Sequence, residues 1–193
     1  MAEFGALAHH MAVHIVAMNV AAPAVALAWR AFNPWSGHAW TSWLWPAAVL
    51  QLALLLGWHL PAVLTSAFAS HAVMAAMHLS LFLAALAFWL AVIDAAEEAA
   101  WRPLVALAAT GKIFCLLGVL YALAPRVIYP GLASAHHPMP PAELLADQQL
   151  AGLLMLIACP IAYGLAGLAV AARWLSAFDR RPNTLTEPPR RAF

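Results

Sequence analysis

Histidines recur at helical spacing in the first half of this chain. His10 and His14 are four residues apart, and His71 and His78 are seven apart with Met74 between them. On an α-helix, residues three, four or seven apart share one face, so each stretch would present its imidazoles together. Imidazole is the commonest metal ligand in proteins and is costly to bury in hydrocarbon. The spacing therefore predicts a metal site between helices.

A further histidine and one acidic residue complete the candidate ligands. His59 and Asp147 each lie near the end of an apolar stretch, level with the paired histidines once these stretches are threaded through a bilayer. Asp147 is a candidate metal ligand, a hydrogen-bond partner for a ligating imidazole, or the N-cap of the helix that follows. His71 is a similar candidate, and alone it would be an ordinary residue at headgroup level. The predicted ligands are thus His10, His14, His59, His78, Asp147 and His71.

Sulfur-containing side chains lie near these histidines but carry a weaker signal. Thioethers are soft ligands that suit Cu(I), yet methionine in an apolar helix more often fills the core. The methionines concerned are Met11, Met18, Met74 and Met77. Cys115 and Cys159 form no CxxC pair, and we expect them to pack as small hydrophobic side chains.

The composition indicates an integral membrane protein. Hydrophobic residues make up 65% of the 193 residues and charged residues 9%, and the mean hydropathy is +0.83. The apolar stretches, each about the 20 residues that a spanning helix needs, are 4–29, 43–64, 71–93, 103–124 and 150–175. We predict an all-α polytopic membrane helix bundle with about five transmembrane helices. Residues 1–176 would form its single domain, and 177–193 a basic, Pro-rich, disordered cytoplasmic tail.

The basic residues predict how the bundle is oriented. With five spans, nearly all of them fall on one side of the membrane, which the positive-inside rule makes cytoplasmic. These residues are Arg30, Arg102, Arg173, Arg180, Arg181, Arg190 and Arg191. The N-terminus is then outside and the C-terminus inside. Eight of the nine histidines, including His136 and His137 in a Pro-rich outer loop, share the outer side, and His38 alone lies inside.

Three functional classes fit this pattern. The first is a metal-binding and transfer protein without catalytic turnover. The second is an electron-transfer protein with a non-covalent haem, because no CxxCH is present, held axially by His14 and His78. The third is a zinc or iron metalloenzyme with Asp147 as its base, although no HExxH signature is present. No phosphate loop, hydrolase triad or nucleic-acid-binding surface is recognisable.

Several of these same segments resemble one known family. The segments, in order, are HHMAVHIVAMNVAAPAVAL from His9, WHLPAVL with His59 and Pro61, MHLSLFLAALAFW with His78 and Trp89, Gly111-Lys112, Tyr129-Pro130, and ADQQLAGLLM with Asp147 and Gln148. Together they look like the CtaG family of integral membrane cytochrome c oxidase assembly factors. The resemblance extends from the first span to the fifth, and this chain looks like a short form.

The resemblance implies a role in the maturation of haem–copper oxidase. Together with the arginine pattern, it predicts a multi-pass protein of the bacterial inner membrane with a periplasmic N-terminus, and we expect a binding and transfer protein that is not an enzyme. It favours copper as the bound metal, delivered to a periplasmic-side centre, and haem–copper oxidase subunits or copper chaperones as partners. Residue chemistry alone leaves copper, zinc, iron and haem open, because imidazoles suit all of them.

The orientation is testable by reporter fusions along the chain. A fusion after Arg173 should be active only as a cytoplasmic reporter, because the arginines gather on that side. A fusion in the loop after Arg126 should behave in the opposite way. Cytoplasmic activity at both positions would show that the number of spans between them is even, and the shared side of the histidines would be lost.

Overall fold

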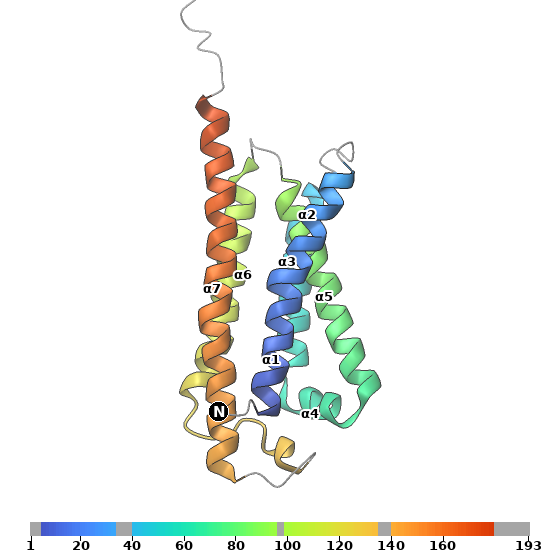
Figure 1. The fold of residues 1–193 in the computed structure, drawn as a ribbon, viewed down its shortest axis with the longest axis vertical. Helices are drawn as coiled ribbons and strands as arrows, with labels where there is room; N and C mark the ends of the chain where they lie inside the picture. Colours follow the sequence, from blue (N-terminus) through green and yellow to red (C-terminus); the bar gives the residue numbers. More distant parts are fainter. Residues whose placement is uncertain (1–4, 34–39, 96–98, 135–139, 180–193) are drawn as a thin grey trace, which may run out of the picture.

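The computed structural model describes residues 5–33, 40–95, 99–134 and 140–179, and these residues form helices and no strand (Figure 1). Five helices are long and apolar enough to cross a membrane, as the sequence predicts. They are Ala6–Phe32, Thr41–Trp58, His71–Ile93, Trp101–Leu123 and Pro141–Ala177. The all-α bundle with five such helices is therefore confirmed.

The first span is interrupted by a widened turn directly after the paired histidines. It consists of α1 (Ala6–Val16), the π-helical turn η1 (Ala17–Ala21) and α2 (Ala22–Phe32). Pro23 follows the turn, and a proline inside a helix clashes with the carbonyl four residues earlier. Widening to a π-turn relieves this clash, so Pro23 gives a physical reason for the interruption.

One indole compensates for the hydrogen bond that this proline removes. In the π-turn, the backbone N–H of Ala22 donates to the carbonyl of Ala17, five residues earlier. The corresponding donor for the carbonyl of Met18 would be residue 23, and Pro23 has no N–H. Trp89 instead donates its indole N–H to that carbonyl at 2.8 Å. This bond ties the π-turn to the neighbouring long helix.

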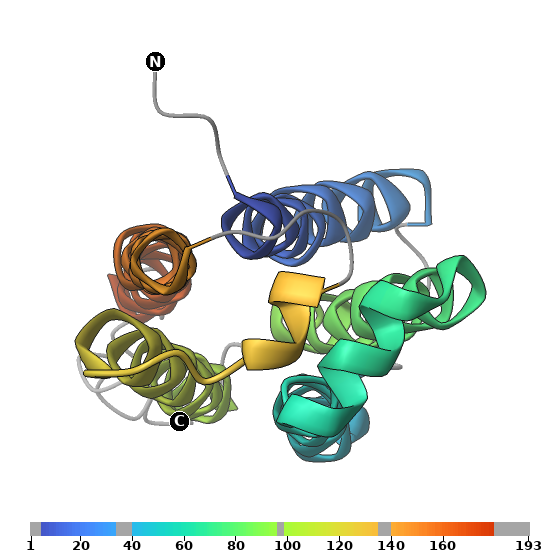
Figure 2. The same ribbon diagram turned by 90° about the horizontal axis from the view of Figure 1, so that it is seen from below.

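The second span ends earlier than the sequence predicts. A short turn η2 (Thr41–Trp43) leads into α3 (Leu44–Trp58), and the expectation of a helix continuing to residue 64 is wrong. Leu60 is extended because the residue before a proline is pushed out of the helical region. Pro61 then starts the separate helix α4 (Pro61–Ala69), which crosses one end of the bundle (Figures 1 and 2).

The last three long helices close the bundle. They are α5 (His71–Ile93), α6 (Trp101–Leu123) and α7 (Pro141–Asp179). Helix α7 starts nine residues before the predicted residue 150 and includes Pro160 without ending there. The predicted outer loop is correspondingly shorter and contains the 3-10 turn η4 (Pro130–Ser134). His136, His137, His38 and the tail from 180 onward lie outside the described residues.

Helices α6 and α7 pack side by side along the bundle (Figures 1 and 2). A Cβ atom at Gly152 would overlap the backbone of Gly118 and Ala122 on the facing helix. Small residues allow this close approach, which favours helix association in a membrane where hydrophobic burial between helices contributes little. The pair thereby forms one wall of the bundle, against which α1 packs.

Charged residues meet at the end of the bundle opposite the histidines. Asp94 is buried, accepts a hydrogen bond from the backbone N–H of Trp40 at 3.1 Å and lies 3.5 Å from the Arg30 guanidinium. Arg173 donates to the carbonyl of Ile93. We call this the arginine end, defined by Arg30, Asp94 and Arg173. The other end, which holds His10, His59 and His78, is the histidine end, so the expected separation of the two residue types is present.

The Trp89 bond predicts a clear stability effect. Trp89→Phe keeps a ring but leaves the Met18 carbonyl without its donor, which should lower the free energy of unfolding by about 1–3 kcal/mol. Thermal unfolding of the detergent-purified protein would measure it. Trp101→Phe, at an exposed position on α6, is the matched control and should be nearly neutral. Equal stability of the two variants would show that the bond to the π-turn contributes nothing.

Candidate metal centre

Three histidines from two helices meet inside the histidine end. His10 and His14 lie on α1 and His78 on α5, and one ring nitrogen of each lies within 4.8 Å of the other two. Their ring centroids are 4.2 Å (His10–His14), 4.7 Å (His14–His78) and 5.2 Å (His10–His78) apart. His10 and His14 are each only 4% exposed. The helical spacing seen in the sequence thus does bring these imidazoles together.

His59 lies beside this group as its fourth imidazole. Its ring centroid is 5.7 Å from that of His14 and 6.3 Å from that of His10. His59 ends α3 just before the chain turns at Leu60 and Pro61, so the same turn that shortens the second span aims this side chain into the bundle. We refer to His10, His14, His59 and His78 together as the histidine cluster.

Hydrogen bonds select which nitrogen of two rings faces the cluster. Nδ1 of His59 lies 2.6 Å from the carbonyl of Leu55, and Nδ1 of His78 lies 2.9 Å from the carbonyl of Met74. A carbonyl only accepts, so each Nδ1 carries the proton and each Nε2 carries the lone pair. Ligating histidines are oriented in the same way, by a bond from the other ring nitrogen to a carbonyl or carboxylate.

The inward-facing nitrogens have no partner among the described residues. These atoms are buried Nε2 of His10, His59 and His78 and both ring nitrogens of His14. Such groups are costly to bury without a hydrogen bond, and a set of them in one place needs an explanation. Burial also lowers the pKa of His59, which favours the neutral ring that metals bind.

The spacing of the nitrogens fits a metal ion with a small adjustment. Nitrogen ligands lie about 2.0–2.1 Å from a bound Zn²⁺, so two of them on one ion are at most about 4.2 Å apart. The nitrogens of His10, His14 and His78 lie within 4.8 Å of one another, and a slight rotation of these three rings would close that spread. The donor set of neutral imidazoles, with lone pairs facing inward, therefore suits a transition metal.

A tyrosine pair, Tyr121 and Tyr129, holds His59 in place, although neither was predicted to belong to the site. The Tyr129 hydroxyl donates to the backbone carbonyl of His59 at 2.7 Å, and Tyr121 is hydrogen-bonded to Tyr129. Because the Tyr129 hydroxyl already donates its proton to the His59 carbonyl, the Tyr121 hydroxyl is the donor in the bond between the two tyrosines. Burial raises the pKa of Tyr129 to about 12, so it keeps that proton at neutral pH. The sequence did contain a signal for this pair, because Tyr121 and Tyr129 lie near the end of the fourth apolar stretch on the side predicted for the histidines.

Asp147 has a different position and a different contact from those expected. It does not begin the last span, because α7 starts at Pro141, so its role as N-cap of that helix is wrong. Its two carboxylate oxygens instead accept the backbone N–H groups of Leu7 and Ala8, at 2.9 and 3.1 Å, in the first turn of α1. These N–H groups have no partner within their own helix, and a negative charge is favoured there.

This contact from α7 fixes the height of α1 in the bundle. A Cβ atom at Gly5 would overlap the Asp147 carboxylate, so the residue at the N-cap of α1 must be small. The neighbouring Gln148 is buried and accepts the N–H of Ile128 at 2.7 Å, which secures the segment before η4. The Asp147–Gln148 pair thus positions the elements around the histidine cluster, and the structure places Asp147 outside the group of close ring nitrogens.

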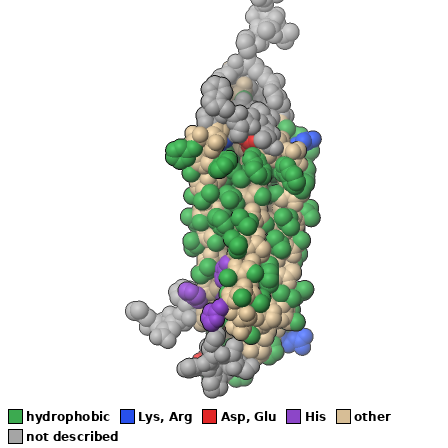
Figure 3. Space-filling view, turned by 90° about the vertical axis from the view of Figure 1, so that its right-hand side faces the viewer, with side chains coloured by type: hydrophobic (Ala, Val, Ile, Leu, Met, Phe, Trp, Pro, Cys, Tyr) green, Lys and Arg blue, Asp and Glu red, His purple; other side chains and the backbone are tan. Residues whose placement is uncertain are grey.

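A surface groove of about 630 Å³ leads to the histidine cluster. His9 and His71 are exposed on its lining, while His10 and His78 are its more buried members. The groove also contains Met74. Histidine side chains reach the surface near one end of the molecule in Figure 3. His71 therefore belongs to the approach and not to the close group of nitrogens.

The family of cytochrome c oxidase caa3 assembly factors (Caa3_CtaG) matches residues 3–177. The chain belongs to this family. The match includes every described helix that contributes to the histidine cluster. No curated protein and no solved structure matches the chain. Membership of the Caa3_CtaG family confirms the predicted resemblance and a role in cytochrome c oxidase assembly, and the geometry above is that of one member.

The Asp147 contact predicts the outcome of removing one charge. In Asp147→Asn, only one side-chain oxygen remains to accept the two N–H groups, and the negative charge at the start of α1 is lost. The free energy of unfolding should fall by about 1–2 kcal/mol, measured by thermal unfolding in detergent. Glu143→Gln removes an exposed charge from the first turn of α7 without breaking a contact to α1, so it should cost less, about 0.3–1 kcal/mol at most. If both variants unfold like the parent, the carboxylate does not hold α1.

Proposed function

We propose that this protein binds copper at the histidine cluster and hands it to cytochrome c oxidase during assembly of the oxidase. Copper is its cargo, and no catalytic turnover is involved. The observation that carries the proposal is the cluster itself: imidazoles from α1, α5 and the end of α3, three of them buried and His78 half-buried, with ring nitrogens that lack hydrogen-bond partners in the described structure. Family membership supplies the oxidase as the destination.

The donor set favours copper transfer over metalloenzyme chemistry. Imidazoles bind copper in both oxidation states and bind zinc or iron as well. A hydrolytic zinc or iron site usually adds a carboxylate ligand or a general base. The one carboxylate predicted for that role, Asp147, is bonded to the start of α1 through both of its oxygens. The copper-carrier function therefore fits the described residues better.

The groove offers a route between the surface and the cluster. Exposed His9 and His71 would receive copper at the surface, and His10 and His78 would take it inward. The arginine pattern supports a position of this end on the periplasmic side of a bacterial inner membrane, with the C-terminus in the cytoplasm, which we propose. Copper chaperones and oxidase subunits on that side are the partners we infer.

Axial haem ligation by His14 and His78 fits this arrangement poorly. A haem iron needs its two axial rings on opposite faces of a macrocycle. The rings of His14 and His78 are 4.7 Å apart, and His10 lies 4.2 Å from His14. A porphyrin between them would have to push α1 away from α5. An optical spectrum without a Soret band would agree with the copper function, whereas a stoichiometric Soret band would replace it.

Substitution of single histidines provides the direct test. His10→Ala, His14→Ala and His78→Ala should each weaken Cu(II) binding by about tenfold or more, because a ligand set loses affinity steeply when a member is removed. Cu(II) titration of the purified protein, followed by electron paramagnetic resonance for nitrogen ligation, measures this. All three variants should remain folded, because alanine removes unpartnered nitrogens, and the Met74 carbonyl that loses the His78 side chain still has its backbone partner within α5.

The matched control is His38→Ala. The arginine pattern puts His38 at the opposite side of the membrane, so this variant should bind Cu(II) like the parent. Unchanged Cu(II) affinity in His14→Ala, or loss of affinity in His38→Ala equal to that of the cluster variants, would contradict the proposed site.

A further inference from the structure

A small cavity lies on the other side of the histidine cluster from the groove residues. Its volume is about 20 Å³, enough for one water-sized occupant. The cavity shares His14 and His59 with the cluster, whereas the groove shares His10 and His78. The four imidazoles are therefore divided between two different spaces. We call the smaller space the sulfur cavity, for the side chains that line it.

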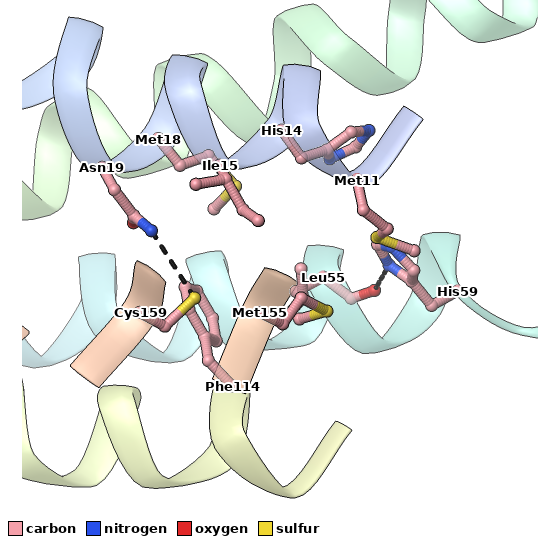
Figure 4. A pocket seen from close by; sticks show the side chains of 10 residues that line it. All are labelled: Met11, His14, Ile15, Met18, Asn19, Leu55, His59, Phe114, Met155 and Cys159. Carbon is pink, nitrogen blue, oxygen red and sulfur yellow. Dashed lines mark hydrogen bonds between the residues drawn. The ribbon is translucent and has the colours of Figure 1, made fainter. Parts of the chain in front are cut away.

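Four sulfur atoms line the sulfur cavity (Figure 4). Met11 and Met18 come from α1 and η1, and Met155 and Cys159 come from α7 at a spacing of four residues, which puts them on one helix face. All four side chains are at most 3% exposed. The sulfurs thus approach one space from two facing segments of the bundle.

The positions of these sulfurs depend on features already described. Met18 lies in the π-turn caused by Pro23, and this turn changes the direction in which its side chain points relative to a continuous α-helix. Asn19, in the same turn, donates its amide N–H to Sγ of Cys159 at 3.5 Å. The contact shows that α7 and the π-turn meet at this cavity.

The remaining lining is apolar except for the shared imidazoles. Ile15, Leu55 and Phe114 offer no hydrogen bond. Both ring nitrogens of His14 are buried without a partner among the described residues, as is Nε2 of His59. A soft metal ion can bind one imidazole lone pair per ring together with thioether and thiolate donors. Cu(I) is the soft ion that matches the cargo proposed above.

Charge also favours a monovalent ion at this position. An uncompensated charge in the bundle interior is costly, and a divalent ion would leave more of it than a monovalent one. Ligation through Cys159 releases the thiol proton to bulk water, and the thiolate then cancels the single charge of Cu(I). The Cu(I)–thiolate pair has no net charge, and the thioethers add neutral donors.

We propose that the sulfur cavity is a second metal site, which takes Cu(I) through Cys159 and neutral donors drawn from Met11, Met18, Met155 and His14, the last of which belongs also to the histidine cluster. This inference rests on the proposed function only for the identity of the cargo. The histidine cluster then connects a surface groove whose lining includes four histidines with a sulfur-lined store within the bundle.

Paired variants of the full-length protein test this site. Met155→Leu combined with Cys159→Ser should lose about one equivalent of Cu(I) in an anaerobic titration against a competing chelator. The matched control is Met77→Leu with Cys115→Ser, since Met77 is fully buried and neither residue lines the cavity. The control should bind as much Cu(I) as the parent. Equal Cu(I) content in both double variants would make the four sulfurs core packing and overturn the proposal.

X-ray absorption of the unsubstituted protein loaded with Cu(I) gives a test independent of folding. Sulfur scatterers around copper, lost in Met155→Leu with Cys159→Ser and kept in the control, support the site. Ligation by nitrogen alone would overturn it.

The same measurement separates this inference from the proposed function. His10→Ala and His78→Ala alter only cluster residues outside the cavity lining. If these two variants keep sulfur-ligated Cu(I) while losing Cu(II) affinity, both proposals stand. If they keep full Cu(II) affinity but the sulfur signal is present, the cluster fails as a copper site and the cavity stands.

Discussion

Within a bilayer, no water is at hand to satisfy a polar group, so each donor and acceptor must find its partner within the protein. Most of the specific contacts in this bundle follow from that constraint. The first backbone N–H groups of α1 donate to the Asp147 carboxylate. The Met18 carbonyl, which lacks a backbone donor because residue 23 is proline, accepts the Trp89 indole N–H. The carbonyl of His59 accepts the Tyr129 hydroxyl. The first two contacts each join two helices, and the third joins the end of α3 to the segment before η4, so satisfying the backbone also fixes how these elements are placed.

The histidine cluster contributes most of the exceptions to this rule among the described residues, with five of the nine buried side-chain atoms that lack a hydrogen-bond partner. Nδ1 of His59 and Nδ1 of His78 each donate to a carbonyl one turn earlier, which orients the two rings. The Nε2 atoms of these rings have no hydrogen-bond partner among the described residues. A bundle that provides partners for isolated backbone groups elsewhere leaves several lone pairs converging here. That contrast is the physical basis of the proposed copper site, and it does not depend on any single distance.

Helical periodicity in the sequence predicted which histidines share a helix face. It could not predict contacts between residues on different helices. The four-residue and seven-residue spacings of His10, His14, His71 and His78 correctly placed three imidazoles together, although His71 proved to line the groove. Apolar length identified five spans but could not show that Leu60 and Pro61 end the second one.

Contacts between distant helices could not be predicted. Asp147 looked like a local cap or a ligand because its real partners, Leu7 and Ala8, are about 140 residues away. The sulfurs of α7 were equally hidden, since the face on which they lie relative to α1 depends on how the helices pack.

The π-turn sets the rotational phase between the two halves of the first span. A π-turn contains one residue more than the α-helical path, and each residue of an α-helix turns the chain by about 100°. The extra residue in η1 sets the rotation between α1 and α2. With this rotation, the histidines of α1 face His78 while Arg30 of α2 faces Asp94. Removing one residue from 17–21 would restore a regular helix but turn one half away from its partners. Length in this short segment is thus under stronger constraint than residue identity, and an alignment of relatives should place no gap there unless Pro23 is also replaced.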